Sequence, residues 1–62
     1  MPFVNITMAK GRTMEQKRAM AQSITDVVAD CLDVDPEVVW IHIDEFDREN
    51  FATGGKLMAD KR

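Results

Sequence analysis

The sequence lacks most of the features that hold a very small protein together or tie it to another kind of molecule. It contains one cysteine, Cys31, and one histidine, His42, so an intrachain disulfide and a four-ligand zinc site are both excluded. No apolar run approaches the roughly 18 residues of a membrane span, and no secretory leader is expected. The formal net charge is −3 with interspersed signs, unlike the basic stripe of a nucleic-acid binder. We therefore expect a cytoplasmic protein with no bound metal and no membrane or nucleic-acid partner.

What the chain does have is a high proportion of apolar residues for its length. Hydrophobic residues make up 45% of its 62 positions, and residues 1–62 suffice for one small domain. A domain of this size buries only about 60% of the surface that its unfolded chain exposes. Without a disulfide or a metal it needs another source of stability. We therefore predict a single domain that forms a homo-oligomer.

A strand and a long helix are predicted in the first half of the chain. Residues 2–8, PFVNITM, alternate apolar and polar side chains as a half-buried strand does. Thr13 followed by Gln16 has the spacing of a capping box, and apolar residues then recur at three- and four-residue steps. The pattern predicts a helix from about Met14 to Leu32, with Cys31 in the core.

The second half of the chain completes a βαβ unit. Pro36 ends the helix, because the residue before a proline is pushed out of helical geometry, and a second strand follows at 38–44, VVWIHID. Strand, helix and strand at this spacing predict parallel strands. Residues 45–51 are expected to form a charged loop, and Gly54-Gly55 the turn of a short C-terminal hairpin. The predicted fold class is therefore α/β, with one βαβ unit plus a hairpin. The sheet face away from the helix carries Phe3, Trp40 and His42, and we expect another subunit to cover it.

Taken together, these pieces resemble the 4-oxalocrotonate tautomerase family. The resemblance rests on Met1-Pro2, the Gly11-Arg12 pair, the EQK at the helix start, and Phe51 followed by Gly54-Gly55; it spans the whole chain. It implies a tautomerase-like fold and a cofactor-independent keto–enol tautomerase. The implied substrate is a 2-hydroxy-dienoate such as 2-hydroxymuconate, or an arylpyruvate enol. The resemblance also implies a hexamer, a trimer of dimers, whose sites are shared between subunits.

Three residues take functional roles through this resemblance. Pro2, once Met1 is removed, is the N-terminal secondary amine that acts as the general base. Arg12 binds a substrate carboxylate, often in a neighbouring subunit's site, and Phe51 helps to wall the pocket. An apolar pocket and a nearby cation disfavour an ammonium ion, which suits such an amine to act as a base at neutral pH. From the residues alone, Pro2 is also compatible with a strand start, Arg12 with a solvated surface and Phe51 with hairpin packing.

Trp40 departs from the family pattern. The family has a second arginine at this position, which binds the keto or enol oxygen of the substrate. We expect Trp40 to contact the substrate, to pack at a subunit interface, or both, and to favour a less charged or aromatic monocarboxylate. The donor to the substrate oxygen then stays open among Arg48, a backbone N–H, the Trp40 indole and water. The dehalogenase relatives have an acidic residue just after the loop phenylalanine, where this chain has Ala52 and Thr53, so no efficient dehalogenation is expected.

Two hypotheses of different classes follow. The first is the proline-based tautomerase described above. The second is a non-catalytic or weakly active oligomeric scaffold that keeps the tautomerase fold, which Trp40 in place of arginine favours. We expect His42 to be a structural residue of the sheet, and Arg48, within the charge run DEFDRE, to be a solvated or salt-bridged surface residue.

Overall fold

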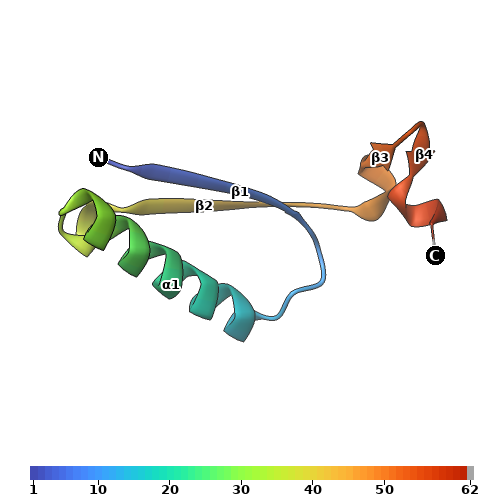
Figure 1. The fold of residues 1–62 in the computed structure, drawn as a ribbon. Coiled ribbons are helices and arrows are strands. Elements are labelled where there is room, and N and C mark those ends of the chain that lie inside the picture. Colours follow the sequence, from blue (N-terminus) through green and yellow to red (C-terminus); the bar gives the residue numbers. More distant parts are fainter. Residues whose placement is uncertain (62) are drawn as a thin grey trace.

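A computed structural model describes residues 1–61, which form one βαβ unit followed by a small hairpin (Figure 1). The two long strands and the helix lie at one end of the molecule, and the hairpin lies beyond the end of the sheet. The elements are β1 (Phe3–Ala9), α1 (Met14–Leu32), β2 (Trp40–Phe46), β3 (Ala52–Thr53) and β4 (Lys56–Leu57), with 3₁₀ turns at Pro36–Val38, Arg48–Asn50 and Met58–Asp60.

The sheet confirms the predicted topology. β1 and β2 are parallel, with Phe3 opposite Trp40 at one end and Ala9 opposite Phe46 at the other. α1 lies against one side of this sheet. Val4, Ile6 and Met8 of β1 are partly buried on that side, while the residues between them are exposed. The alternation in the sequence therefore assigns the two sheet faces correctly.

The helix begins where the sequence predicts and ends by its own cap. The Thr13 hydroxyl accepts from the Gln16 N–H, and the Gln16 side chain accepts from the Thr13 N–H, which completes the capping box. At the other end Asp33 takes a left-handed conformation with φ 53°, and its N–H donates to the Ala29 carbonyl. Helices commonly end on a residue in this conformation. The helix therefore ends at Leu32 through this C-cap and not through the effect of Pro36.

The second strand begins and ends two residues later than predicted. Val38 belongs to a 3₁₀ turn rather than to the strand, because the Asp35 side chain accepts from the Glu37 N–H and the Val38 N–H donates to the Asp35 carbonyl. Glu45 and Phe46, predicted as loop, belong to β2 because β1 reaches Ala9 and pairs with them. The charged segment that follows forms a 3₁₀ turn, Arg48–Asn50. The C-terminal hairpin is confirmed, with Gly54 and Gly55 at φ 59° and 82°, as its turn requires.

The core of the single chain is very small. Only Ala29 and Val39 are buried among the hydrophobic residues described. Cys31, predicted to lie in the core, is exposed, and Val27 of the same apolar stripe is 61% exposed. The physical reason is that two strands make too narrow a sheet to cover the whole stripe.

The chain is also more extended than an independent domain of its length. Its radius of gyration is 14.9 Å, whereas about 11 Å is usual for a compact chain of this size. Its accessible surface is 4962 Å², against about 4,000 Å² for a compact monomer of the same mass. The excess of about 900 Å² is close to what one partner buries in a standard interface. Both measures support the predicted need for other subunits.

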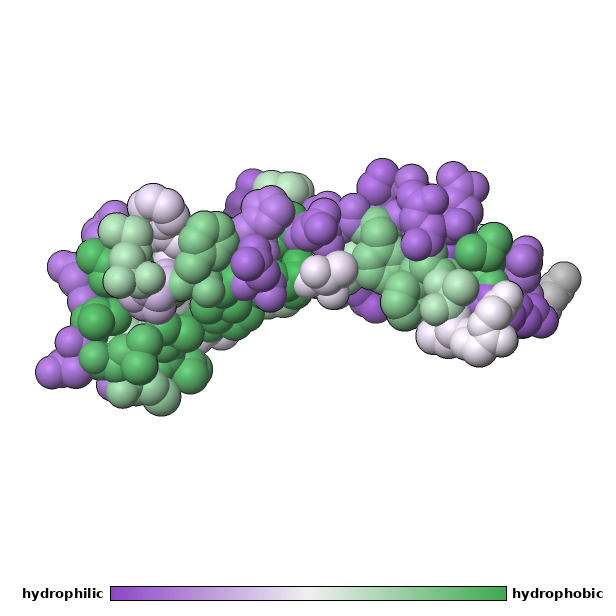
Figure 2. Space-filling view, turned by 90° about the horizontal axis from the view of Figure 1, so that it is seen from above, coloured by the Kyte–Doolittle hydropathy of each residue, from purple (hydrophilic) through white to green (hydrophobic). Residues whose placement is uncertain are grey.

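The sheet face away from α1 is open, as predicted. We call this the uncovered sheet face. Figure 2 views the molecule from this side and shows hydrophobic residues concentrated over the half that holds β1, β2 and α1. Phe3 is 57% exposed and Trp40 51% exposed. The exposed residues of the uncovered sheet face are Phe3, Asn5, Thr7, Trp40, His42 and Asp44.

Within residues 1–61, no helix is long and apolar enough to cross a membrane.

Candidate active site

Pro2 and Trp40 lie together at the start of the two parallel strands. The Trp40 backbone N–H donates to the Pro2 carbonyl at 3.0 Å, which extends the sheet by one step. The Trp40 ring meets the Phe3 ring edge to face, with centroids 6.0 Å apart. The Pro2 position is therefore partly buried beside a half-exposed aromatic pair. With Met1 in place the Pro2 nitrogen is an amide, so base chemistry at this atom requires that Met1 be removed.

Arg12 lies at the opposite end of β1. It stands between Gly11, whose φ of 127° disfavours any side chain, and Thr13, the helix N-cap. Seven strand residues at about 3.3 Å each separate it from the Pro2 end by roughly 20 Å. Arg12 of one chain therefore does not reach Pro2 of the same chain. A pocket of about 400 Å³ opens beside it, lined by Met8, Ala9, Arg12, Gln16, Lys17 and Met20.

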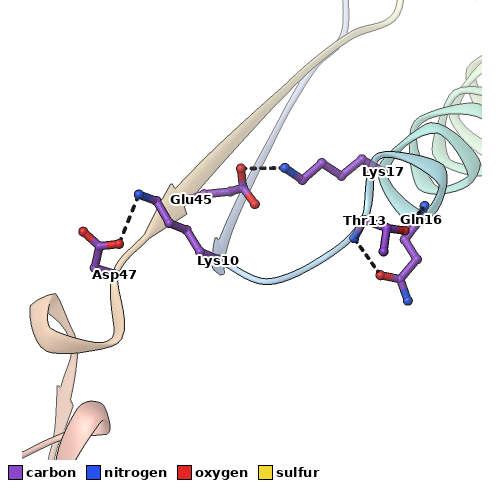
Figure 3. A network of polar contacts seen from close by, with 6 residues as sticks. All are labelled: Lys10, Thr13, Gln16, Lys17, Glu45 and Asp47. Carbon is purple, nitrogen blue, oxygen red and sulfur yellow. Dashed lines mark hydrogen bonds and ion pairs between the residues drawn. The ribbon is translucent and has the colours of Figure 1, made fainter.

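Polar contacts fix the chain on both sides of Arg12 (Figure 3). Before it, Lys10 donates its backbone N–H to the Phe46 carbonyl at 3.0 Å, and its ammonium lies 3.1 Å from Asp47. After it, the capping box closes the first turn of α1. One turn further on, the Lys17 ammonium lies 2.7 Å from Glu45 Oε1 on β2. These contacts tie the Arg12 loop to the end of β2.

Phe51 is far from Pro2 as well. Its ring stacks at 30° on the Phe46 ring, with centroids 5.1 Å apart, and it is 38% exposed. Its carbonyl accepts from the Met58 N–H at 2.7 Å, which closes the hairpin. The hairpin lies at the end of the molecule opposite the N-terminus (Figure 1). One chain thus brings Trp40 to Pro2 but carries Arg12 and Phe51 at the other end.

The other residues considered from the sequence are placed as follows. His42 is exposed on the uncovered sheet face, opposite Asn5 in the register. Arg48 is exposed in its 3₁₀ turn and forms no ion pair with any described carboxylate. Residues 1–61 contain no cluster of three or more side chains suited to hold a metal ion. The sequence does not predict the Lys17–Glu45 pair, because its pattern places Glu45 in a loop.

Sequence and structure comparisons identify the family. The sequence model of the tautomerase enzyme family matches residues 2–61. The chain belongs to the tautomerase family. It is 38% identical over 61 residues to a probable tautomerase of Bacillus cereus, covering 98% of this chain and 100% of the relative. It is 33% identical over 60 residues to the 2-hydroxymuconate tautomerase of Bacillus subtilis, covering 97% of each.

Comparison of the fold with solved structures identifies the same family. A heterohexameric 4-oxalocrotonate tautomerase from Chloroflexus aurantiacus matches with a TM-score of 0.92 and 34% identity over 100% of both chains. The resemblance stated from the sequence is therefore confirmed, and so is the tautomerase-like βαβ fold. The protein is a tautomerase, and hence an isomerase, of a family whose members form oligomers.

Proposed function

We propose that this chain is a cofactor-independent keto–enol tautomerase whose general base is the amine of Pro2, exposed by removal of Met1. Its substrate is a 2-hydroxy-dienoate such as 2-hydroxymuconate, or an arylpyruvate enol. Residues 1–62 act as one domain. The observation that carries the proposal is the placement of Pro2 beside Trp40, with Arg12 at the far end of β1. If Pro2 and Arg12 act on the same substrate molecule, the site is made by more than one copy of the chain.

The proposed reaction moves one proton. The neutral Pro2 amine takes the proton of the enol hydroxyl, the C=O bond forms as the C=C bond shifts, and the protonated amine delivers its proton to carbon. Arg12 holds the substrate carboxylate through two parallel hydrogen bonds, the geometry that a guanidinium favours. A donor to the substrate oxygen stabilises the charge that develops there. The Trp40 backbone N–H already donates to the Pro2 carbonyl, which leaves the Trp40 indole N–H, Arg48, another backbone N–H or water as the donor.

A two-fold pairing of chains would bring Arg12 of one copy to Pro2 of another. β1 pairs with β2 along one edge and has no strand along its other edge among the described residues. If two copies of β1 pair antiparallel about Ile6, the middle residue of the strand, Ala9 of one copy lies opposite Phe3 of the other. Arg12 of one copy then lies close to Pro2 of the other. We propose that such pairs assemble further as a hexamer, a trimer of dimers, in which Phe51 also walls a neighbouring copy's site.

The test begins with protein whose intact mass shows that Met1 is absent. Ketonisation of 2-hydroxymuconate and of the enol of phenylpyruvate is then compared between the parent and Pro2→Ala. General base catalysis contributes about 10²- to 10⁴-fold, so Pro2→Ala is expected to lose at least 100-fold. Ser23→Ala, on the exposed side of α1, serves as the matched control and should retain parental rates. A slow parent with the same rates as Pro2→Ala would instead leave a different enol substrate or the scaffold hypothesis.

A further inference from the structure

The pocket beside Arg12 holds two cations that differ in their partners. The Lys17 ammonium lies 2.7 Å from a Glu45 oxygen, and both side chains are about three-quarters buried, with 23% and 24% exposed. Figure 3 shows the Lys17 side chain reaching from the first turn of α1 to β2 to make this contact. Arg12, by contrast, forms no ion pair with any carboxylate in residues 1–61.

This difference sets the charge that a ligand meets. A partly buried pair at this distance interacts strongly, because solvent screens it far less than an exposed pair. Lys17 and Glu45 therefore present almost no net charge to a ligand in the pocket. The Gln16 amide oxygen is also engaged, since it accepts from the Thr13 N–H at 2.9 Å. The rest of the lining is apolar, from Met8, Ala9 and Met20.

We infer that Glu45 is a specificity-determining residue: by holding Lys17, it leaves Arg12 as the one available cation among the described residues that line the pocket. Such a site selects a monocarboxylate with an apolar body over a dicarboxylate. The inference rests on the proposed function, in which Arg12 binds the substrate carboxylate. Trp40 points to the same substrate class, because it places an aromatic ring, and no second cation, beside Pro2.

Binding of two unreactive acids tests this inference without relying on catalysis. Hexanoate and adipate have six carbons each and differ by one carboxylate, so the ratio of their dissociation constants reports the charge preference of the site. In the parent, hexanoate is expected to bind more tightly. Glu45→Gln frees the Lys17 ammonium and should shift the ratio toward adipate by about fivefold, the size of a partly screened charge interaction.

Three further variants separate charge from structure. The double variant Lys17→Met with Glu45→Gln frees no cation and should restore the parental ratio. Asp47→Asn removes the more exposed pair with Lys10 and should leave the ratio unchanged. Lys17→Met alone leaves the Glu45 carboxylate unpaired and should weaken adipate more than hexanoate, which provides a test even if Glu45→Gln does not fold.

The outcomes separate the inference from the proposed function. A merely structural role of Glu45 would weaken both acids equally, and an unchanged ratio in Glu45→Gln overturns the inference, as does a failure of the parent to bind either acid. If the ratio shifts as expected but the parent shows no Pro2-dependent ketonisation, the proposed function fails and the charge inference stands. If ketonisation depends on Pro2 but the ratio does not move, only the inference fails.

Discussion

Truncation of Phe3 should weaken the oligomer by a predictable amount. A phenylalanine side chain offers about 200 Å² for burial, and Phe3 is 57% exposed in the single chain. If a second copy covers the uncovered sheet face, roughly 110 Å² of this ring becomes buried on assembly. At about 25 cal/mol per Å² this contributes about 3 kcal/mol per chain, or a factor of about 100 in the dissociation constant for each chain that loses its ring. We therefore expect Phe3→Ala to shift the assembly midpoint, measured by sedimentation velocity over a dilution series, to much higher protein concentration.

The matched control for Phe3 is Met14. Met14 is 59% exposed, so it offers a similar share of apolar surface, but it lies at the start of α1 and away from the uncovered sheet face. Met14→Ala should therefore assemble at nearly the parental concentration. If both variants assemble like the parent, or if Met14→Ala weakens assembly as much as Phe3→Ala does, no second copy covers Phe3 on the uncovered sheet face.

Two further predictions concern the site and the helix start. Trp40→Arg places a cation beside Pro2. It should raise the ratio of kcat/KM for 2-hydroxymuconate to kcat/KM for a phenylpyruvate enol by about tenfold, which is the contribution of a hydrogen bond to a charged group. Trp40→Phe is the control, and an unchanged ratio in Trp40→Arg contradicts the proposed role of Trp40 in substrate choice. Thr13→Ala removes the cap bond to the Gln16 N–H and should lower the free energy of unfolding by about 1 kcal/mol. Urea denaturation checks this, with Ser23→Ala on the exposed helix side expected to cause no loss.

The fold was predictable because the local signals agree with one another. The alternation in 2–8 and the helical stripe give the two faces, and Thr13 with Gln16 gives the helix start. The errors arise where tertiary contacts decide. β2 continues through Phe46 because β1 offers Ala9 as a partner, and this pairing is invisible in the charged run of the sequence. Val38 is drawn into a 3₁₀ turn by the Asp35 cap.

The candidate site was predictable only in part. The residue types and their motif nominate Pro2, Arg12, Phe51 and Trp40, but no local pattern states how far apart they lie. That Arg12 and Phe51 stand at the end of the chain opposite Pro2 follows from the lengths of the strands and the place of the hairpin. The neutralisation of Lys17 likewise depends on a side chain 28 positions away in the sequence.

Exposed apolar residues show a second limit of what the sequence can predict, namely which side chains are buried. Cys31 belongs to a regular helical stripe, so periodicity assigns it to a core. Periodicity reports which side of a helix is apolar, and not how wide a sheet is available to cover it. In the single chain Cys31 is exposed, and the stripe is wider than the sheet beneath it.

We propose one site that needs Pro2 and Arg12 from different copies of the chain. The most direct measurement combines two inactive variants, Pro2→Ala and Arg12→Ala, by coexpression with different tags and purification of the mixed oligomer. Random mixing in equal amounts leaves both residues intact in about one quarter of shared sites, so the mixed oligomer is expected to recover about a quarter of the parental ketonisation rate. A mixed oligomer as inactive as either variant alone would contradict the shared site.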